Sequence, residues 1–128
     1  MNAGEMKASA LDAVFTVERP WGNFEQFLSN AVGTVKVITV APKQRLSLQR
    51  HQLRDELWCI LDGPIDITLN DRSWQAQADE LVWVPRTTVH RMGNSGQVRA
   101  RVLEVAFGTF DEDDIERLDD DYQRVPQH

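Results

Sequence analysis

The feature that most constrains the fold of this chain is a succession of short β-type segments that are separated by turn residues. The segments span residues 23–28, 34–40, 45–50, 56–61, 65–69, 72–77, 80–84, 88–92 and 98–107. Within one of them, Ile65, Ile67 and Leu69 alternate with polar residues, which is typical of a strand with one buried face. Short strands at regular spacing, with no long helical periodicity between them, predict an all-β antiparallel sandwich or barrel.

The two ends of the chain lack this pattern. Residues 1–16 are expected to be a leader that is either one helical turn or disordered, and residues 17–128 are expected to form a single domain. Near the C-terminus, residues 111–121 hold eight acids and one arginine. Because acidic side chains favour a helix N-terminus, this acidic segment predicts a short helix over 111–118.

Charge and hydropathy exclude several classes of function. The formal net charge is −6, and the acidic segment alone carries −7, so the remaining chain is close to neutral. A nucleic-acid-binding surface is therefore not expected, whereas an anionic small molecule is compatible with this balance. No apolar run approaches the ~20 residues of a membrane span, and no secretory signal is visible, so we expect no membrane contact and a cytoplasmic location.

Four residues form a candidate metal site. On a strand, Gln49 and His51 point to the same face, and Glu56 begins the next segment after a turn. The second imidazole, His90, follows Pro85 at the start of a later segment. Two imidazoles, a carboxylate and an amide oxygen suit a divalent transition metal with open positions for water or substrate. The alternative is that these are structural side chains with no metal between them.

The spacing of these residues resembles the two motifs of the cupin superfamily. The first frame reads Gln49, one residue, His51, four residues, Glu56, six residues and Gly63. The second frame reads Pro85, four residues, His90, three residues and Asn94. The resemblance implies a single-domain double-stranded β-helix, or jelly-roll barrel, that is followed by the short acidic C-terminal segment.

Four further stretches are similar to the C-terminal isomerase domain of bifunctional mannose-1-phosphate guanylyltransferase/mannose-6-phosphate isomerases. They are RPWG at 19–22, RLSLQRH at 45–51, RDELW at 54–58, and EDDI with DDYQR within 112–124. The resemblance implies one divalent ion on Gln49, His51, Glu56 and His90, with Zn, Mn, Co, Ni and Fe not distinguished. It also implies interconversion of mannose 6-phosphate and fructose 6-phosphate by a homodimer.

The resemblance also implies residues for substrate and catalysis. A phosphosugar dianion requires fixed positive charge, and Lys36, Arg45 and Arg54 match family positions. Arg54 lies in the turn beside the metal ligands and is the preferred phosphate ligand and one catalytic residue. Glu104, in the last long segment, is the candidate general base. For each of these residues the alternative is an ordinary surface charge or a salt-bridged carboxylate.

The chain departs from the family at three positions where histidine is usual. His51 is followed by Gln52 and Leu53 instead of two further histidines, and Leu57 replaces another. If those groups served proton transfer, we expect slow isomerisation at best. A non-catalytic metal- and sugar-binding cupin and a small metal-dependent oxygenase therefore stay open as alternatives.

Overall fold

The computed structural model describes residues 14–124, and this range contains eleven β-strands and no helix. The strands are β1 (Phe15–Arg19), β2 (Gly22–Gln26), β3 (Gly33–Val40), β4 (Leu48–Arg50), β5 (Arg54–Asp62), β6 (Ile65–Leu69), β7 (Arg72–Ala76), β8 (Leu81–Val84), β9 (His90–Gly93), β10 (Ala100–Gly108) and β11 (Glu116–Asp119). The all-β prediction is confirmed. None of the described residues belongs to a helix long and apolar enough to cross a membrane.

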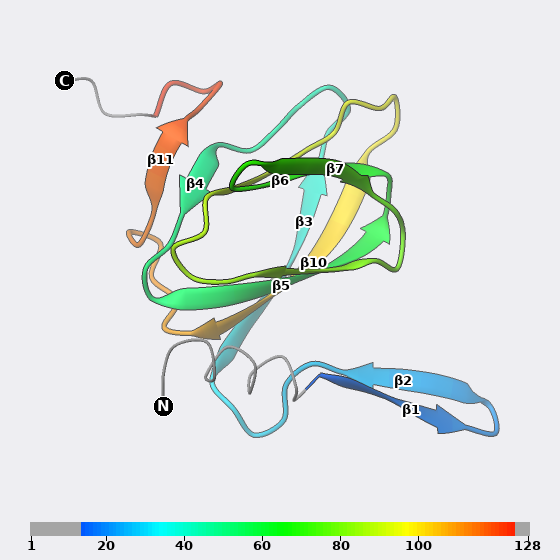
Figure 1. The fold of residues 1–128 in the computed structure, drawn as a ribbon. Helices are drawn as coiled ribbons and strands as arrows, with labels where there is room; N and C mark the ends of the chain where they lie inside the picture. The colour runs from blue at the N-terminus through cyan, green and yellow to red at the C-terminus, as the bar shows by residue number, and fades with distance from the viewer. Residues whose placement is uncertain (1–13, 125–128) are drawn as a thin grey trace.

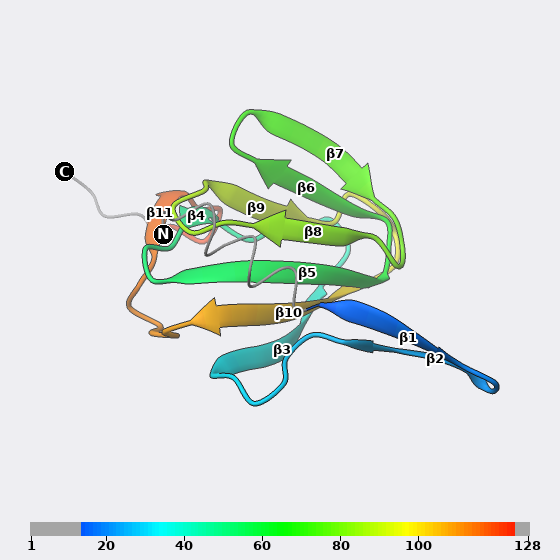
Figure 2. The same cartoon turned by 60° about the horizontal axis from the view of Figure 1, so that its bottom comes forward.

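Two antiparallel sheets make up the body of the molecule. One has the strand order β3-β10-β5-β8 and the other has the order β11-β4-β9-β6-β7. Figures 1 and 2 show the sheets as the two walls of a barrel, with the β1-β2 hairpin projecting away from it. From β3 to β11 the chain passes from one sheet to the other at each step except between β6 and β7, which are neighbours in one sheet, so the arrangement is a jelly roll, as the cupin resemblance implies.

The core fills the space between the two sheets. It includes Trp58 and Ile60 of β5, Ile65 and Ile67 of β6, and Val102 of β10, all almost fully buried. The alternation seen in residues 65–69 is thus a strand with one face in the core. Burying each such aliphatic side chain contributes roughly 1.5–3 kcal/mol, which holds the two walls together and leaves the polar site at one end.

The predicted helix over 111–118 is wrong. Residues 116–119 form β11, which pairs with β4 so that Glu116 lies opposite Arg50 and Arg117 opposite Gln49. The acids that suggested a helix instead serve a turn, since the Asp114 carboxylate accepts hydrogen bonds from the backbone amides of residues 52 and 53. Pairing with the edge of β4 provides hydrogen-bond partners for the backbone of β11, whereas a segment this short does not form a stable helix by itself.

The predicted leader, residues 1–16, falls mostly outside the described range. Its last two residues, Phe15 and Thr16, belong to β1, which pairs with β2 in an unbroken antiparallel register. Residues 1–13 lie outside the described range, so the predicted boundary between leader and domain at residue 17 stays a prediction.

Candidate metal centre

A cavity of about 320 Å³ opens at the end of the barrel where β4 and β11 lie. Its wall comes from both sheets and from the acidic segment. The lining residues are Lys36, Ile38, Leu46, Ser47, Gln49, His51, Arg54, Glu56, Glu104, Glu112, Ile115, Arg117 and Arg124. Most of these side chains carry polar atoms, so this end of the barrel is a polar site above an apolar core.

Three of the four predicted metal ligands form a cluster at the edge of this cavity, which His51 and Glu56 line. The side chains of His51, Glu56 and His90 are buried, and each offers a ligand atom within 4.8 Å of the other two. His51 Nε2 lies 3.5 Å from Glu56 Oε2, and His90 Nε2 lies 3.9 Å from Glu56 Oε1. Residues far apart in sequence are brought together because β4 ends, and β5 and β9 begin, at this side of the barrel.

Backbone carbonyls orient both imidazoles. His51 Nδ1 donates to the Asp114 carbonyl at 2.7 Å, and His90 Nδ1 donates to the Thr88 carbonyl at 3.0 Å. A carbonyl can only accept, so each Nδ1 carries the proton and each Nε2 keeps its lone pair. Burial lowers the pKa of both imidazoles, which keeps them neutral. This is the arrangement in which metal-binding histidines are usually held.

The Nε2 lone pairs of His90 and His51 have different surroundings. His90 Nε2 is buried and has no hydrogen-bond partner among the described residues, although a buried unpaired acceptor costs about 1–3 kcal/mol. His51 Nε2 accepts a hydrogen bond from Arg54 Nη2 at 3.2 Å. An orphaned nitrogen beside a carboxylate and a second imidazole fits a divalent transition metal in its donor set.

Glu56 is held in place by two neighbours on its own strand. Trp58 Nε1 donates to its Oε1 at 3.1 Å, and Arg54 Nε donates to its Oε2 at 2.9 Å. Burial alone would raise the pKa of Glu56, but His90, His51 and Arg54 together outweigh burial and lower it. The carboxylate is therefore ionised, as a metal ligand must be.

Arg54 lies inside the site, but its donors are already in use. Besides Glu56 and His51, its guanidinium reaches the Asp111 carbonyl at 3.4 Å and stacks over the Phe110 ring at 4.2 Å. Its side chain is only 7% exposed. Arg54 thus acts first as the counter-cation of Glu56, and its predicted role as phosphate ligand stays a prediction.

Glu104 and Lys36 face the same cavity from neighbouring strands. Burial and the charge of Glu56, to which Glu104 hydrogen-bonds, raise the pKa of Glu104 to about 8, against the opposing effect of Lys36. Lys36 Nζ lies 3.9 Å from Glu104 Oε2 and 4.3 Å from the centre of the Phe110 ring. Glu104 therefore holds a proton at neutral pH, next to the ionised Glu56.

Gln49, the fourth predicted ligand, also lines the cavity. It sits on β4 directly opposite His90 of β9. The structure therefore places its amide in the wall of the site, and coordination by that amide stays a prediction.

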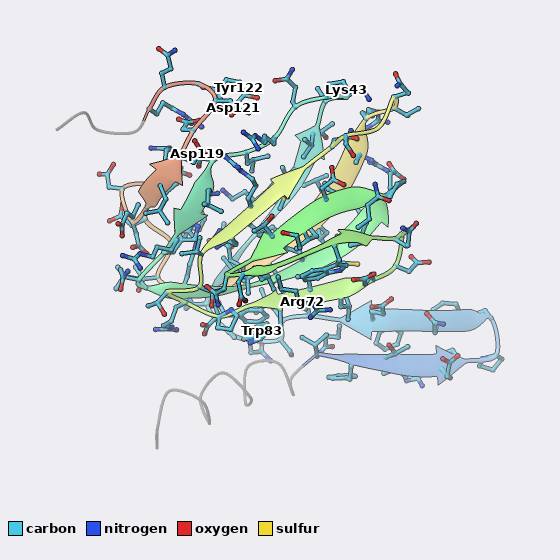
Figure 3. All side chains as sticks on the ribbon, turned by 45° about the horizontal axis from the view of Figure 1, so that its top comes forward. Lys43, Arg72, Trp83, Asp119, Asp121 and Tyr122 are labelled. Carbon is cyan, nitrogen blue, oxygen red and sulfur yellow. The ribbon has the colours of Figure 1, made fainter. Side chains whose placement is uncertain are left out.

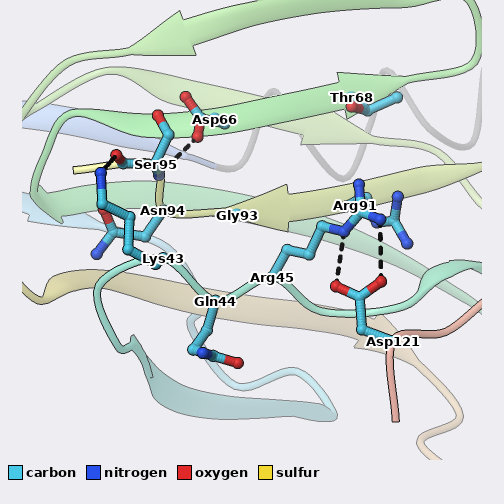
Figure 4. A pocket seen from close by; sticks show the side chains of 10 residues that line it. All are labelled: Lys43, Gln44, Arg45, Asp66, Thr68, Arg91, Gly93, Asn94, Ser95 and Asp121. Carbon is cyan, nitrogen blue, oxygen red and sulfur yellow. Dashed lines mark hydrogen bonds and ion pairs between the residues drawn. The ribbon is translucent and has the colours of Figure 1, made fainter. Parts of the chain in front are cut away.

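Arg45, another predicted substrate-binding residue, does not line the metal-site cavity, and its role in substrate binding stays a prediction. Its Nε and Nη2 donate to the Asp121 carboxylate at 2.8 and 2.9 Å. Together with Asp66 and Arg91 it lines a separate cavity of about 530 Å³ (Figure 4). Because β4 begins only at Leu48, the strand alternation of Gln49 does not extend back to Arg45.

The three positions that lack the family's histidines do not line the metal-site cavity. Gln52 and Leu53 are exposed in the turn before β5. Leu57 is buried on the opposite face of β5 from Glu56 and lies across from Trp83 and Val105 of the neighbouring strands. Their positions argue against the idea that their replacement removed proton-transfer groups from the site, and the effect on the rate stays a prediction.

Sequence reasoning missed the part of the cavity that the acidic segment supplies. Glu112, Ile115, Arg117 and Arg124 all line it. Figure 3 shows this segment, marked by Asp119, Asp121 and Tyr122, running along the rim beside β4. The alternation of Ile115 and Arg117 with outward-facing residues was the available signal, and the helix prediction concealed it.

A jelly-roll barrel with histidine and carboxylate side chains at its mouth defines the cupin class of proteins, and solved structures agree with this fold. A dTDP sugar isomerase from Desulfovibrio desulfuricans G20 superposes with a TM-score of 0.64 at 18% identity, over 90% of this chain and 86% of that one. A Cupin 2 conserved barrel domain protein from Salinispora arenicola CNS-205 gives a TM-score of 0.57 at 16% identity, over 75% of each chain.

The family model described as mannose-6-phosphate isomerase C-terminal matches residues 6–120, and the chain belongs to this family. The alginate biosynthesis protein AlgA of Pseudomonas aeruginosa is 38% identical over 112 residues, which is 87% of this chain and 23% of AlgA. The mannose-1-phosphate guanylyltransferase ManC of Salmonella typhimurium is 34% identical over 110 residues, which is 85% of this chain and 23% of ManC. The chain thus spans about a quarter of the length of these relatives.

Proposed function

We propose that this chain is a metal-dependent isomerase that interconverts mannose 6-phosphate and fructose 6-phosphate, in the service of polysaccharide biosynthesis. One observation carries the proposal. In a member of this family, one cavity is lined by His51, Glu56 and Glu104, and His90 lies beside His51 and Glu56, so two imidazole lone pairs lie close to the ionised Glu56 and the protonated Glu104. Aldose–ketose isomerisation needs a proton carrier next to a group that stabilises a developing oxyanion.

The residues of the chain divide this work. His51, Glu56 and His90, with Gln49 as a fourth ligand, would hold a divalent ion, and that ion would polarise the C1 and C2 oxygens of the sugar. Glu104 is suited to carry the proton between these carbons, because a pKa of about 8 lies close to neutral pH. Lys36 favours the ionised form of Glu104 and so assists it as a base.

The test compares Glu104→Gln with the wild-type protein after both are loaded with the same divalent metal. A coupled assay measures conversion of mannose 6-phosphate, and elemental analysis measures metal on the same samples. We expect E104Q to lose about 10²–10⁴-fold in turnover at unchanged metal content. The exposed Glu25 of β2 provides the control, since E25Q removes a carboxylate far from the cavity. Equal turnover in wild type and E104Q would overturn the role of Glu104.

Two other outcomes correspond to the alternative functions. Metal-loaded wild type that binds mannose 6-phosphate without converting it would identify a non-catalytic sugar-binding cupin. An oxygenase is the second candidate, since His51, His90 and Glu56 are also the two-histidine, one-carboxylate set of Fe(II) oxygenases. Oxygen consumption by the Fe(II)-loaded protein, without isomerisation, would support that candidate.

We further propose a cytoplasmic location and a homodimer. In support of pairing, β3 is an edge strand of its sheet, and its residues Val35 and Val37 are about half exposed. Light scattering on the purified chain tests the homodimer, and a monomer at all concentrations would overturn that proposal.

A further inference from the structure

We propose that Arg117 is the residue that anchors the phosphoryl group of the substrate, an inference that rests on the proposed function. In the described part of the chain, two buried side-chain nitrogens lack a hydrogen-bond partner. One is His90 Nε2, which the metal site explains. The other is Nε of Arg117, a partly buried side chain, and a buried N–H without an acceptor is costly unless an acceptor arrives in the functional state.

The direction of Arg117 follows from the strand register. Arg117 of β11 pairs with Gln49 of β4, so the two side chains share one face of the sheet, and both line the cavity. Its neighbour Glu116 points to the other face, where it forms an ion pair with Arg50 at 2.6 Å. The guanidinium of Arg117 is therefore committed to the cavity by the alternation of β11.

The other cations that line the cavity are already engaged. Arg54 donates to Glu56 and His51. Lys36 lies beside Glu104, and Arg124 binds both oxygens of Asp120, at 2.7 and 3.2 Å. Within the described residues, Arg117 makes no ion pair, so, unlike Arg54 and Arg124, it can offer positive charge to a ligand without first breaking an internal salt bridge.

The position of Arg117 also suits the size of a hexose phosphate. Arg117, Gln49 and His90 lie in one row across β11, β4 and β9. Two strand spacings separate the backbones at the ends of this row by roughly 10 Å. A hexose whose C1 and C2 oxygens face the histidines can thus extend its 6-phosphate along the row toward Arg117. A planar guanidinium matches a phosphate dianion through paired N–H donors.

The experiment measures binding of mannose 6-phosphate, mannose and inorganic phosphate to the metal-loaded full chain by calorimetry. We expect Arg117→Gln to weaken binding of mannose 6-phosphate and of inorganic phosphate by roughly 10- to 100-fold, the effect of losing one charged hydrogen bond. Mannose binding and metal content should not change. Arg117→Lys should keep part of the affinity for mannose 6-phosphate, because lysine keeps the positive charge. That result would also show that the fold tolerates a substitution at this position. Arg50→Gln, on the opposite face of the same strand pair, should bind all three probes like wild type.

Several results would overturn the assignment. They are wild-type affinity of R117Q for mannose 6-phosphate, an equal loss of affinity for mannose, and a wild-type protein with no preference for the phosphorylated sugar. The outcome is distinguishable from failure of the proposed function. If wild type does not convert mannose 6-phosphate, but R117Q binds mannose 6-phosphate and inorganic phosphate more weakly than wild type, the phosphate site is supported and the isomerase function is wrong. If wild type converts mannose 6-phosphate and R117Q has the same KM as wild type, the isomerase function is supported and the phosphate site at Arg117 is wrong.

Discussion

Replacing Arg54 by methionine removes a cation that occupies two of the groups a metal would use. Its Nε donates to Glu56 Oε2 at 2.9 Å, and its Nη2 donates to His51 Nε2 at 3.2 Å. A neutral imidazole nitrogen has one lone pair, so His51 cannot accept this N–H and bind a metal ion at the same time. We therefore expect Arg54→Met to strengthen binding of a divalent ion.

The magnitude follows from the bonds that the ion must displace. A hydrogen bond to a charged group contributes about 1.5–3 kcal/mol, and the bond to His51 must break fully. Since every 1.4 kcal/mol is tenfold in affinity, R54M should bind the metal roughly 10- to 100-fold more tightly than wild type. The same change leaves Glu56 buried without its counter-cation, so the metal-free R54M protein should unfold at lower denaturant concentration than metal-free wild type.

The assay is a competition titration in which wild type and R54M each compete with a chelator for Co(II), whose visible spectrum also reports coordination. Arg86→Met is the matched control, because Arg86 also pairs with a buried carboxylate of β5, Asp55, but on the outer face. R86M should bind the ion like wild type. An R54M protein that is folded by circular dichroism, yet binds Co(II) no more tightly than wild type, would refute the reasoning.

The remaining predictions concern single groups of the site. His51→Ala should lose most of the bound metal by elemental analysis, because it removes one of two nitrogen ligands, and equal metal in both proteins would contradict the assignment. Because the pKa of Glu104 is raised from 4.5 to about 8, the folded state binds more protons than the unfolded state in this range, so stability should fall as the pH rises through it. Urea unfolding of metal-free wild type and E104Q should show this fall in wild type alone, and parallel curves would exclude Glu104 as its source. Gln52→His with Leu53→His should leave isomerase turnover unchanged, because both positions are exposed outside the cavity, and a clear gain in rate would show that they act on the substrate.

Local pattern was sufficient for most of the strands and for predicting that His51, Glu56 and His90 come together. The alternation of residues 65–69 appears as β6, and the antiparallel barrel follows from the density of turns. The spacing around His51, Glu56 and His90 was informative because a barrel of this kind repeats the same strand-and-turn geometry, so a fixed separation in sequence becomes a fixed position at the mouth. The observed cluster confirms that these three residues meet.

Tertiary pairing decided the rest of the site. The acids of residues 111–118 favour a helix by local preference. In the folded chain, however, β11 pairs with the edge of β4, and the Asp114 carboxylate accepts a backbone N–H from the turn before β5, and neither interaction can be read from local preference. The direction of Arg45 and the burial of Leu57 depend in the same way on where a strand begins and which face meets the core. The sequence by itself therefore determined the fold class and the candidate metal ligands His51, Glu56 and His90. Only the folded chain decided which of them share a cavity, because hydrogen bonds across strands outweigh the weak preferences of a few residues.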